Sequence, residues 1–196
     1  MRLVIILPGH WDAGWAIGSY NNPEGGRSLL GEAIYRYMYR KQWYLVDSLA
    51  RMVKDFSHEH NLFRTCDLFI PIPCSRSFSD YDPISLLVDW ISQLCTIPRA
   101  VGTLSRHGLI SEYSDSGSID ERRGGITVLQ QHVVKNKNVI LIDGIFCNGV
   151  TASLATRSLR QAGARRIEVL TFAKIERTGL HSPFIDPDHQ RPDTNG

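Results

Sequence analysis

One segment constrains the fold of this chain more than any other, the run VILIDGIFCNGVTASLATRSLRQAGARRIEVLTFAK at residues 139–174. Residues 137–143 are rich in β-branched side chains and predict a buried strand. Residues 151–163 have helical spacing and end in a glycine, and residues 165–173 predict a second strand. A strand–helix–strand unit pairs its strands in parallel through a right-handed crossover. The segment therefore predicts an α/β fold, with a parallel sheet covered by helices.

The rest of the chain predicts further elements of such a fold. In chain order we expect an opening strand at 1–9, a short hairpin at 9–20, two helices within 29–56 that separate near Lys41, a strand at 67–73, and a helix at 83–94 with Pro83 in its first turn. Residues 104–125 are polar and show no periodicity, which predicts a long loop of the kind that is usually functional or disordered. The tail from residue 178 contains three prolines and predicts a disordered end.

Composition narrows the functional classes. The net charge of +2 is too small to indicate nucleic-acid binding by itself, and 42% apolar residues permit a packed core. The four cysteines show no CxxC spacing, which favours reduced thiols in a cytosolic protein. The apolar start of the chain is too short for a signal or membrane segment. We therefore expect a cytoplasmic protein without membrane contact.

Two connections leave the carboxyl ends of predicted parallel strands, where α/β sheets bind their ligands. They are PCSRSF after Ile72 and DGIFCNGVT after Ile142. The second leads, through residues 144–151, into a helix whose first amide N–H groups and dipole favour an anion.

The residues of the second connection add specific chemistry. Gly149 lets the backbone approach a ligand closely, and Thr151 adds a hydroxyl donor. Asp143, expected one residue past the strand, can accept hydrogen bonds from sugar hydroxyls. This combination predicts a phosphate beside a polyol. GxGxxG and GxxxxGK[ST] phosphate loops are absent. An ordinary strand-to-helix turn with an acid at its start is the alternative.

The whole segment resembles the phosphoribosyl-pyrophosphate (PRPP) motif of type I phosphoribosyltransferases. That motif has four apolar residues, two acids, two variable residues, Thr-Thr-Gly-x-Thr, a helix ending in glycine, and a strand. The matching positions here are the apolar run 139–142, Asp143 as the first acid, Gly149, Thr151 as the last threonine, and Gly163. Three positions depart from the motif, because Gly144 replaces the second acid, and Cys147 and Asn148 replace two threonines.

The resemblance extends loosely over residues 9–174. LFIPIPCSRS is similar to the strand and pyrophosphate loop of the family, and ERRGGITVLQQHVVKNKNVILID is similar to the lead-in of its competence-associated ComF-like branch. It implies a type I phosphoribosyltransferase-like parallel sheet flanked by helices, in a single domain at 1–177. Within it, residues 1–60 would form a small hood-like N-terminal portion and residues 61–177 the core, followed by the tail at 178–196.

The resemblance also implies a site. Its ligand-binding residues would be Asp143, Gly144, Cys147, Asn148, Gly149, Val150 and Thr151, together with Cys74, Ser75 and Arg76 of the pyrophosphate loop. Asp143, Arg76, Arg122 and Arg123 would carry catalysis, and Asp143 would hold Mg²⁺. The loop at 104–124 would close over the pyrophosphate and exclude water.

Two functions follow from the resemblance. One is binding of PRPP or a nucleoside 5′-monophosphate with Mg²⁺, with transfer of the phosphoribosyl group to a nitrogen nucleophile and release of pyrophosphate. The departures from the motif weaken the case for transfer more than the case for binding. The alternative is a non-catalytic nucleotide-binding accessory in DNA uptake or phage defence, with a protein or nucleic-acid partner. The acceptor base is not encoded in any pattern of the sequence, and a homo-oligomer is left open.

Overall fold

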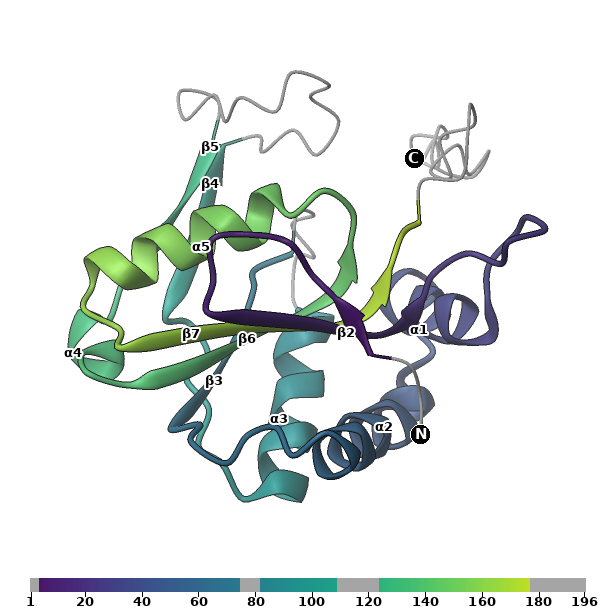
Figure 1. Cartoon of the computed structure of the whole chain (residues 1–196), viewed down its shortest axis with the longest axis horizontal. Helices are drawn as coiled ribbons and strands as arrows, with labels where there is room; N and C mark the ends of the chain where they lie inside the picture. The colour runs from purple at the N-terminus through teal and green to yellow at the C-terminus, as the bar shows by residue number, and fades with distance from the viewer. Residues whose placement is uncertain (1–3, 75–81, 109–123, 177–196) are drawn as a thin grey trace, which may run out of the picture.

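The computed structural model describes residues 4–74, 82–108 and 124–176, and all the structural statements below concern these residues. They form a five-stranded sheet of order β1-β2-β7-β6-β3 (Figure 1). The strands are β1 (Ile5–Ile6), β2 (Ala13–Ser19), β7 (Arg166–Lys174), β6 (Asn138–Phe146) and β3 (Leu68–Pro71). The last four pair in parallel, and β1 pairs antiparallel with β2. The predicted α/β class with a mostly parallel sheet is confirmed.

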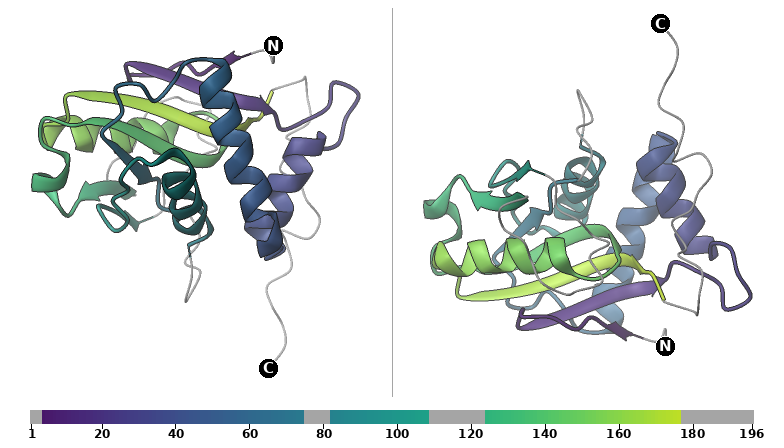
Figure 2. Two further views of the ribbon diagram at one scale, coloured as in Figure 1. Left: turned by 90° about the horizontal axis from the view of Figure 1, so that it is seen from below. Right: turned by 90° about the horizontal axis from the view of Figure 1, so that it is seen from above.

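Helices cover both faces of this sheet. One face is covered by α1 (Leu29–Tyr39), the short 3-10 helix η1 (Trp43–Leu45), α2 (Val46–Glu59) and α3 (Pro83–Cys95). The other face is covered by α5 (Val150–Gln161), α4 (Gln131–Val134) and a separate antiparallel pair, β4 (Leu104–Gly108) and β5 (Gly124–Val128). Figure 2 shows α5 lying over the strands when the molecule is seen from above. None of the helices in the described part of the chain has the length and apolar composition needed to cross a bilayer.

The helix starts follow local capping chemistry. The Ser28 hydroxyl accepts a hydrogen bond from the Gly31 N–H at 2.9 Å, which satisfies one donor of the first turn of α1. The Asp82 carboxylate does the same for the Ile84 N–H at 3.1 Å at the start of α3. Pro83 lies in the first turn of α3, as predicted, where its missing N–H costs nothing.

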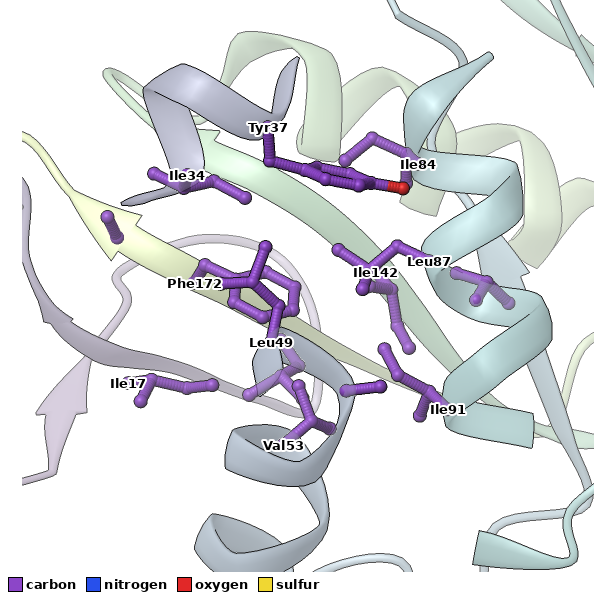
Figure 3. Close-up of a cluster of buried hydrophobic side chains, with 14 of the residues drawn as sticks. Ile17, Ile34, Tyr37, Leu49, Val53, Ile84, Leu87, Ile91, Ile142 and Phe172 are labelled. Carbon is purple, nitrogen blue, oxygen red and sulfur yellow. The ribbon is translucent and has the colours of Figure 1, made fainter. Parts of the chain in front are cut away.

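Alternation along β6 divides the interior into two apolar clusters. Ile140 and Ile142 point towards α1, α2 and α3, where they pack in the cluster shown in Figure 3. Val139 and Leu141 point to the opposite face and pack with α5. Because successive side chains of a strand point to opposite faces, the alternation also assigns Asp143 and Gly144 to opposite faces. At the end of β6 the order changes, since Ile145 packs against the first cluster and Phe146 packs in the second. This division decides where the side chains of the predicted site point.

The expected hairpin within residues 9–20 does not form. Residues Ala13–Ser19 are one strand, β2, which pairs along its length with β7 in the central sheet. Ala16 and Ile17 of β2 are buried on opposite faces, so glycine and aromatic residues in this stretch reflect a strand covered on both sides rather than a turn.

The expected loop at residues 104–125 is also shorter than predicted. Its two ends are the strands β4 and β5, in which Arg106 pairs with Ile126 and Leu104 with Val128. Cross-strand pairing stabilises these polar strands even though they lack an apolar period. Residues 109–123, between the strands, lie outside the described part of the chain.

The break between the predicted helices near Lys41 is confirmed, because α1 ends at Tyr39 and η1 begins at Trp43. The boundaries of the hood-like portion at 1–60 and of the core at 61–177 stay predictions. The tail at 178–196 lies outside the described residues.

Candidate functional site

Asp143 lies inside a strand, whereas the sequence patterns placed it at the end of the strand or one residue past it. β6 continues to Phe146, and Asp143 pairs with Thr171 of β7. The apolar run predicted the start of the strand, but Ile145 and Phe146 extend its pairing beyond the acid. By strand alternation the Asp143 side chain points to the α5 face, together with Leu141.

Gly144 points the other way. A Cβ atom at this position would lie 2.3 Å from Met38 Sδ and 3.2 Å from Ile84 Cδ1, so the space beside Gly144 is already filled by α1 and α3. Since no Cβ approaches other atoms so closely, a side chain here would displace Met38, which is 6% exposed. The predicted ligand contact of Gly144 can therefore come only from its backbone. Its N–H donates to the Asp143 carboxylate at 2.7 Å.

The turn Cys147–Gly149 connects β6 to α5. Gly149 has φ of +79°, and its carbonyl accepts the first hydrogen bond of α5, from the Ser153 N–H at 2.8 Å. The Asn148 side-chain oxygen accepts from the Val150 N–H at 3.1 Å. Asn148 therefore forms an Asx-type turn just before the helix, whose N-cap residue is Gly149. Thr151 follows in the first turn and is buried.

This arrangement produces a small hollow at the N-terminus of α5. Its lining consists of Asp143 and residues 145–152, so it contains Asp143, Cys147, Asn148, Gly149, Val150 and Thr151 of the predicted ligand-binding residues. The enclosed volume is about 10 Å³, close to the room that one water molecule needs. A phosphoryl group would therefore lie over the turn, with at most one of its oxygen atoms in the hollow. The first amide groups of a helix have no acceptor within the helix, and they favour an anion at this position.

Cys74 lies at the same edge of the sheet. It follows β3, which pairs in parallel with β6. Burial raises the pKa of the Cys74 thiol well above its usual range, and the carboxylates of Asp82 and Asp143 raise it further. The thiol therefore stays protonated at neutral pH and acts as a small neutral residue beside Asp143, not as a nucleophile.

The arginines and the serine predicted for the site cannot be placed. Ser75, Arg76, Arg122 and Arg123 lie outside the described residues, and their roles stay predictions. Arg106, at the base of the same loop, lies in β4 and pairs with Ile126.

Sequence patterns did not indicate Thr171. It is fully buried, lies beside Asp143 on the neighbouring strand, and points to the same face by alternation. Its hydroxyl has no hydrogen-bond partner among the described residues. A buried hydroxyl without a partner costs about 1–3 kcal/mol, and an apolar residue would avoid this cost. An isolated threonine in an apolar strand gives no sequence signal, because threonine is common in ordinary strands.

A second, larger hollow lies two strands away. Its volume is about 520 Å³, and its lining includes Ser19, Asn21, Ser28, Leu29 and Glu176. Ser19 pairs with Lys174, which in turn pairs with Phe146 at the end of β6. The ends of β2 and β6 beside the two hollows therefore lie at the same end of the sheet, about 10 Å or two strand spacings apart. The helix starts that line the hollows, those of α1 and α5, cover opposite faces of the sheet.

The donor set fits a magnesium ion only in part. The described residues contain no group of three or more histidine, cysteine, aspartate or glutamate side chains that could hold a metal ion. Mg²⁺ in phosphate-binding sites is commonly held by one or two carboxylates plus the ligand's phosphates and waters. Among the described residues that line the hollow, Asp143 can supply such a carboxylate.

The structure resembles solved structures of known proteins. No protein-family model matches the chain, and no curated protein matches its sequence. Adenine phosphoribosyltransferase from Saccharomyces cerevisiae, solved with adenine and an imino-altritol bisphosphate, aligns with a TM-score of 0.50 at 15% identity, over 70% of this chain and 73% of that chain. Purine phosphoribosyltransferase from Pyrococcus horikoshii aligns with a TM-score of 0.46 at 17% identity, over 72% of this chain and 81% of that chain.

At these identities the likeness concerns the fold alone. The chain shares with the Saccharomyces cerevisiae enzyme an α/β architecture in which a mostly parallel sheet is flanked by helices. The expected phosphoribosyltransferase-like fold is thus confirmed. Neither the ComF-like branch nor the roles of individual site residues are tested by the likeness.

Proposed function

We propose that the protein binds a ribose 5′-phosphate compound, PRPP or a nucleoside 5′-monophosphate, at the N-terminus of α5. The observation that carries this proposal is the position of Asp143 beside the Cys147–Gly149 turn, at the carboxyl edge of the parallel sheet. The amide groups of the turn and of the helix start suit a phosphate. The Asp143 carboxylate suits hydroxyl groups attached to it.

The larger hollow suits the other end of such a ligand. Its strand, β2, ends at the same end of the sheet as β6, and β7 lies between the two. Leu29 and Leu30 give it an apolar wall, while Asn21 and Glu176 supply polar groups. We therefore propose that a base or another acceptor lies there. Most of its lining belongs to the N-terminal portion of the chain.

Mg²⁺, when bound with the ligand, would neutralise the charge of the phosphates, and Asp143 is the described residue that would hold it. In a transfer reaction the bond between ribose C1 and the pyrophosphate oxygen breaks, and the oxygen keeps the electron pair. A nitrogen nucleophile forms the new bond to C1 and loses its proton to solvent. The protein's contribution would be to orient the ligand and to stabilise charge, so that no general base is required.

A second candidate is a nucleotide-binding accessory without transferase activity, in DNA uptake or defence. The observation that favours it is Gly144, whose side-chain direction is blocked by Met38. The ribose would then be held by one carboxylate where the family motif supplies two. A charge-assisted hydrogen bond contributes about 1.5–3 kcal/mol, so the loss weakens the grip without abolishing binding.

Calorimetry with ribose 5-phosphate, nucleoside monophosphates and PRPP, with and without Mg²⁺, tests the binding proposal. Asp143→Asn should weaken binding roughly tenfold to a hundredfold. Asp55→Asn, at an exposed position of α2, is the matched control and should bind like the wild type. The absence of binding of any of these ligands at millimolar concentration would refute the proposal. Pyrophosphate release from PRPP with a panel of bases then separates the transferase from the accessory.

A further inference from the structure

Trp11 lies against the turn of the candidate site, although it is distant from that turn in the sequence. It belongs to the connection of residues 7–12 between β1 and β2, here called the 7–12 segment, and it is 8% exposed. Its ring meets the ring of Phe146 edge to face, with centroids 6.0 Å apart and an interplanar angle of 87°. A Cβ atom at Gly149 would lie 3.4 Å from the far edge of the indole and 2.9 Å from Phe146 Cζ.

The indole is thus in reach of both ends of the turn. Phe146 is the last residue of β6, and Gly149 is the residue that precedes α5. A rigid ring that packs against both of them limits how far the turn between them can open or shift. Aromatic pairs of this geometry contribute beyond the area they bury, and they lose that contribution when either ring tilts.

The position of the indole is itself closely determined. Its Nε1–H donates to the Leu7 carbonyl at 3.0 Å. Two glycines make room for the ring, because a Cβ atom would lie 2.1 Å from it at Gly9 and 2.3 Å from it at Gly14. Neither glycine has a positive φ, so the need for glycine here is one of space and not of backbone conformation.

The neighbouring residue ties the 7–12 segment to the sheet and to α5. The Asp12 carboxylate accepts hydrogen bonds from the Ile167 N–H and from the Arg160 guanidinium, both at 2.7 Å. The Asp12 N–H donates to the Ile167 carbonyl at 2.8 Å. The segment that carries Trp11 is therefore fixed to β7 and to the helix whose N-terminus forms the site.

We propose that Trp11 is a positioning residue that holds the Cys147–Gly149 turn in the shape in which the N-terminus of α5 takes a phosphate. The identity of the ligand in this proposal rests on the proposed function, whereas the statement that Trp11 holds the shape of the turn does not. The indole does not line the hollow and acts through Phe146 and Gly149. The turn would keep its shape without a ligand, so little order has to be gained on binding.

Two measurements on the full chain test this proposal, with Trp11→Phe as the main variant and Trp90→Phe, on α3, as the matched control. The first is hydrogen exchange of the amides of residues 147–152 without ligand. The second is the dissociation constant for ribose 5-phosphate by calorimetry, well below the melting temperature. Trp11→Phe should accelerate exchange in 147–152 while leaving β6 and the last turns of α5 protected. It should also weaken binding about tenfold, equivalent to about 1.4 kcal/mol.

Gly9→Ala provides the second variant in case Trp11→Phe does not fold. Its new methyl group would overlap the indole and displace it without changing the tryptophan, and it should produce the same two effects. If either variant lowers the melting temperature but exchange in 147–152 stays as in the wild type, the indole only fills space and the proposal is wrong. If the wild type binds none of ribose 5-phosphate, nucleoside monophosphates and PRPP, the proposed function fails, and the exchange measurement alone decides the role of Trp11.

Discussion

The Cys147–Gly149 turn offers a sharp test because two glycines with the same backbone conformation differ in their surroundings. Gly149 has φ of +79° and Gly163, after the other end of α5, has φ of +89°. A Cβ atom at Gly149 would lie 2.9 Å from Phe146 Cζ, whereas at Gly163 the nearest atom, Lys135 Cγ, would be 3.5 Å away. Gly163→Ala therefore costs only the left-handed conformation, and Gly149→Ala costs that and a steric overlap.

The magnitudes follow from these two terms. The left-handed conformation costs alanine about 1–2 kcal/mol, and this cost is common to both variants. The stabilising effect of alanine on the unfolded chain, about 0.4–1 kcal/mol, is also common and cancels in the difference. The overlap with Phe146 adds about 1–3 kcal/mol, because the ring is 5% exposed and packs against Trp11. Gly149→Ala should thus be less stable than Gly163→Ala by about 1–3 kcal/mol.

Urea denaturation of both variants measures this difference, and thermal melting should show it as roughly 2–4 °C per kcal/mol. Phe146→Leu combined with Gly149→Ala should recover part of the loss, since the smaller side chain removes the overlap. Binding of ribose 5-phosphate should weaken in Gly149→Ala and stay unchanged in Gly163→Ala. If the two single variants lose the same stability, the turn is not held by the aromatic pair, and the packing argument is refuted.

Three further outcomes are expected. Gly144→Asp should lose about 3 kcal/mol or more of unfolding free energy, because it places a charge among apolar side chains. In a Met38→Ala background this loss should shrink. If urea denaturation shows the same loss in both backgrounds, Met38 is not the obstacle. Thr171→Val should raise the ligand-free stability by roughly 1–3 kcal/mol, and a lower melting temperature would mean that the hydroxyl has a partner. Burial tends to raise the pKa of Asp12, but hydrogen bonds from the Ile167 N–H and from Arg160 lower it below the usual 3.8. The stabilisation by the Asp12 carboxylate is therefore present above the pKa of the unfolded state and is lost as the pH falls through the pKa of the folded state. The difference in unfolding free energy between the wild type and Asp12→Asn should narrow below about pH 4. A difference that does not change with pH would contradict this.

The part of the fold that could be predicted is the part with strong local patterns. The strand at 137–143, the helix at 151–163 and the strand at 165–173 correspond to β6, α5 and β7, because burial on both faces and a helical stripe leave clear periods. β2 was missed because its glycines mark close contacts, of Gly14 with Trp11 and of Gly18 with Leu30, and not a turn. A short pattern cannot distinguish such glycines from those of a turn.

The site shows the same limit. The turn, the helix start and Asp143 follow from the order strand–turn–helix, and the structure brings them together as expected. The surrounding residues, Trp11, Met38 and Thr171, come from three other elements and carry no chemical signature of their own. A tryptophan flanked by Gly9 and Gly14 was the available signal for the first of them. This pattern indicates that the indole packs against backbone atoms, but it does not identify the segment to which they belong.

The glycine after Asp143 is explained by packing rather than by the ligand. Position 144 follows Ile140 and Ile142 on the face of β6 that is covered by α1 and α3, so an acid here would begin among Met38 and Ile84. An unpaired buried charge costs several kcal/mol, whereas the contact that it could offer a ligand is worth about 1.5–3 kcal/mol. With α1 in its present position, glycine is therefore the more stable choice, whatever the site binds. A site with two carboxylates would require the Met38 thioether to swing away from β6. The hydrogen bond from the Tyr37 hydroxyl to the Pro83 carbonyl, at 2.8 Å, holds the neighbouring residue of α1 in place. The departure from the motif is thus built into the packing of the helix layer, and the Met38→Ala background is the one in which the effect of a second acid on ligand affinity can be measured.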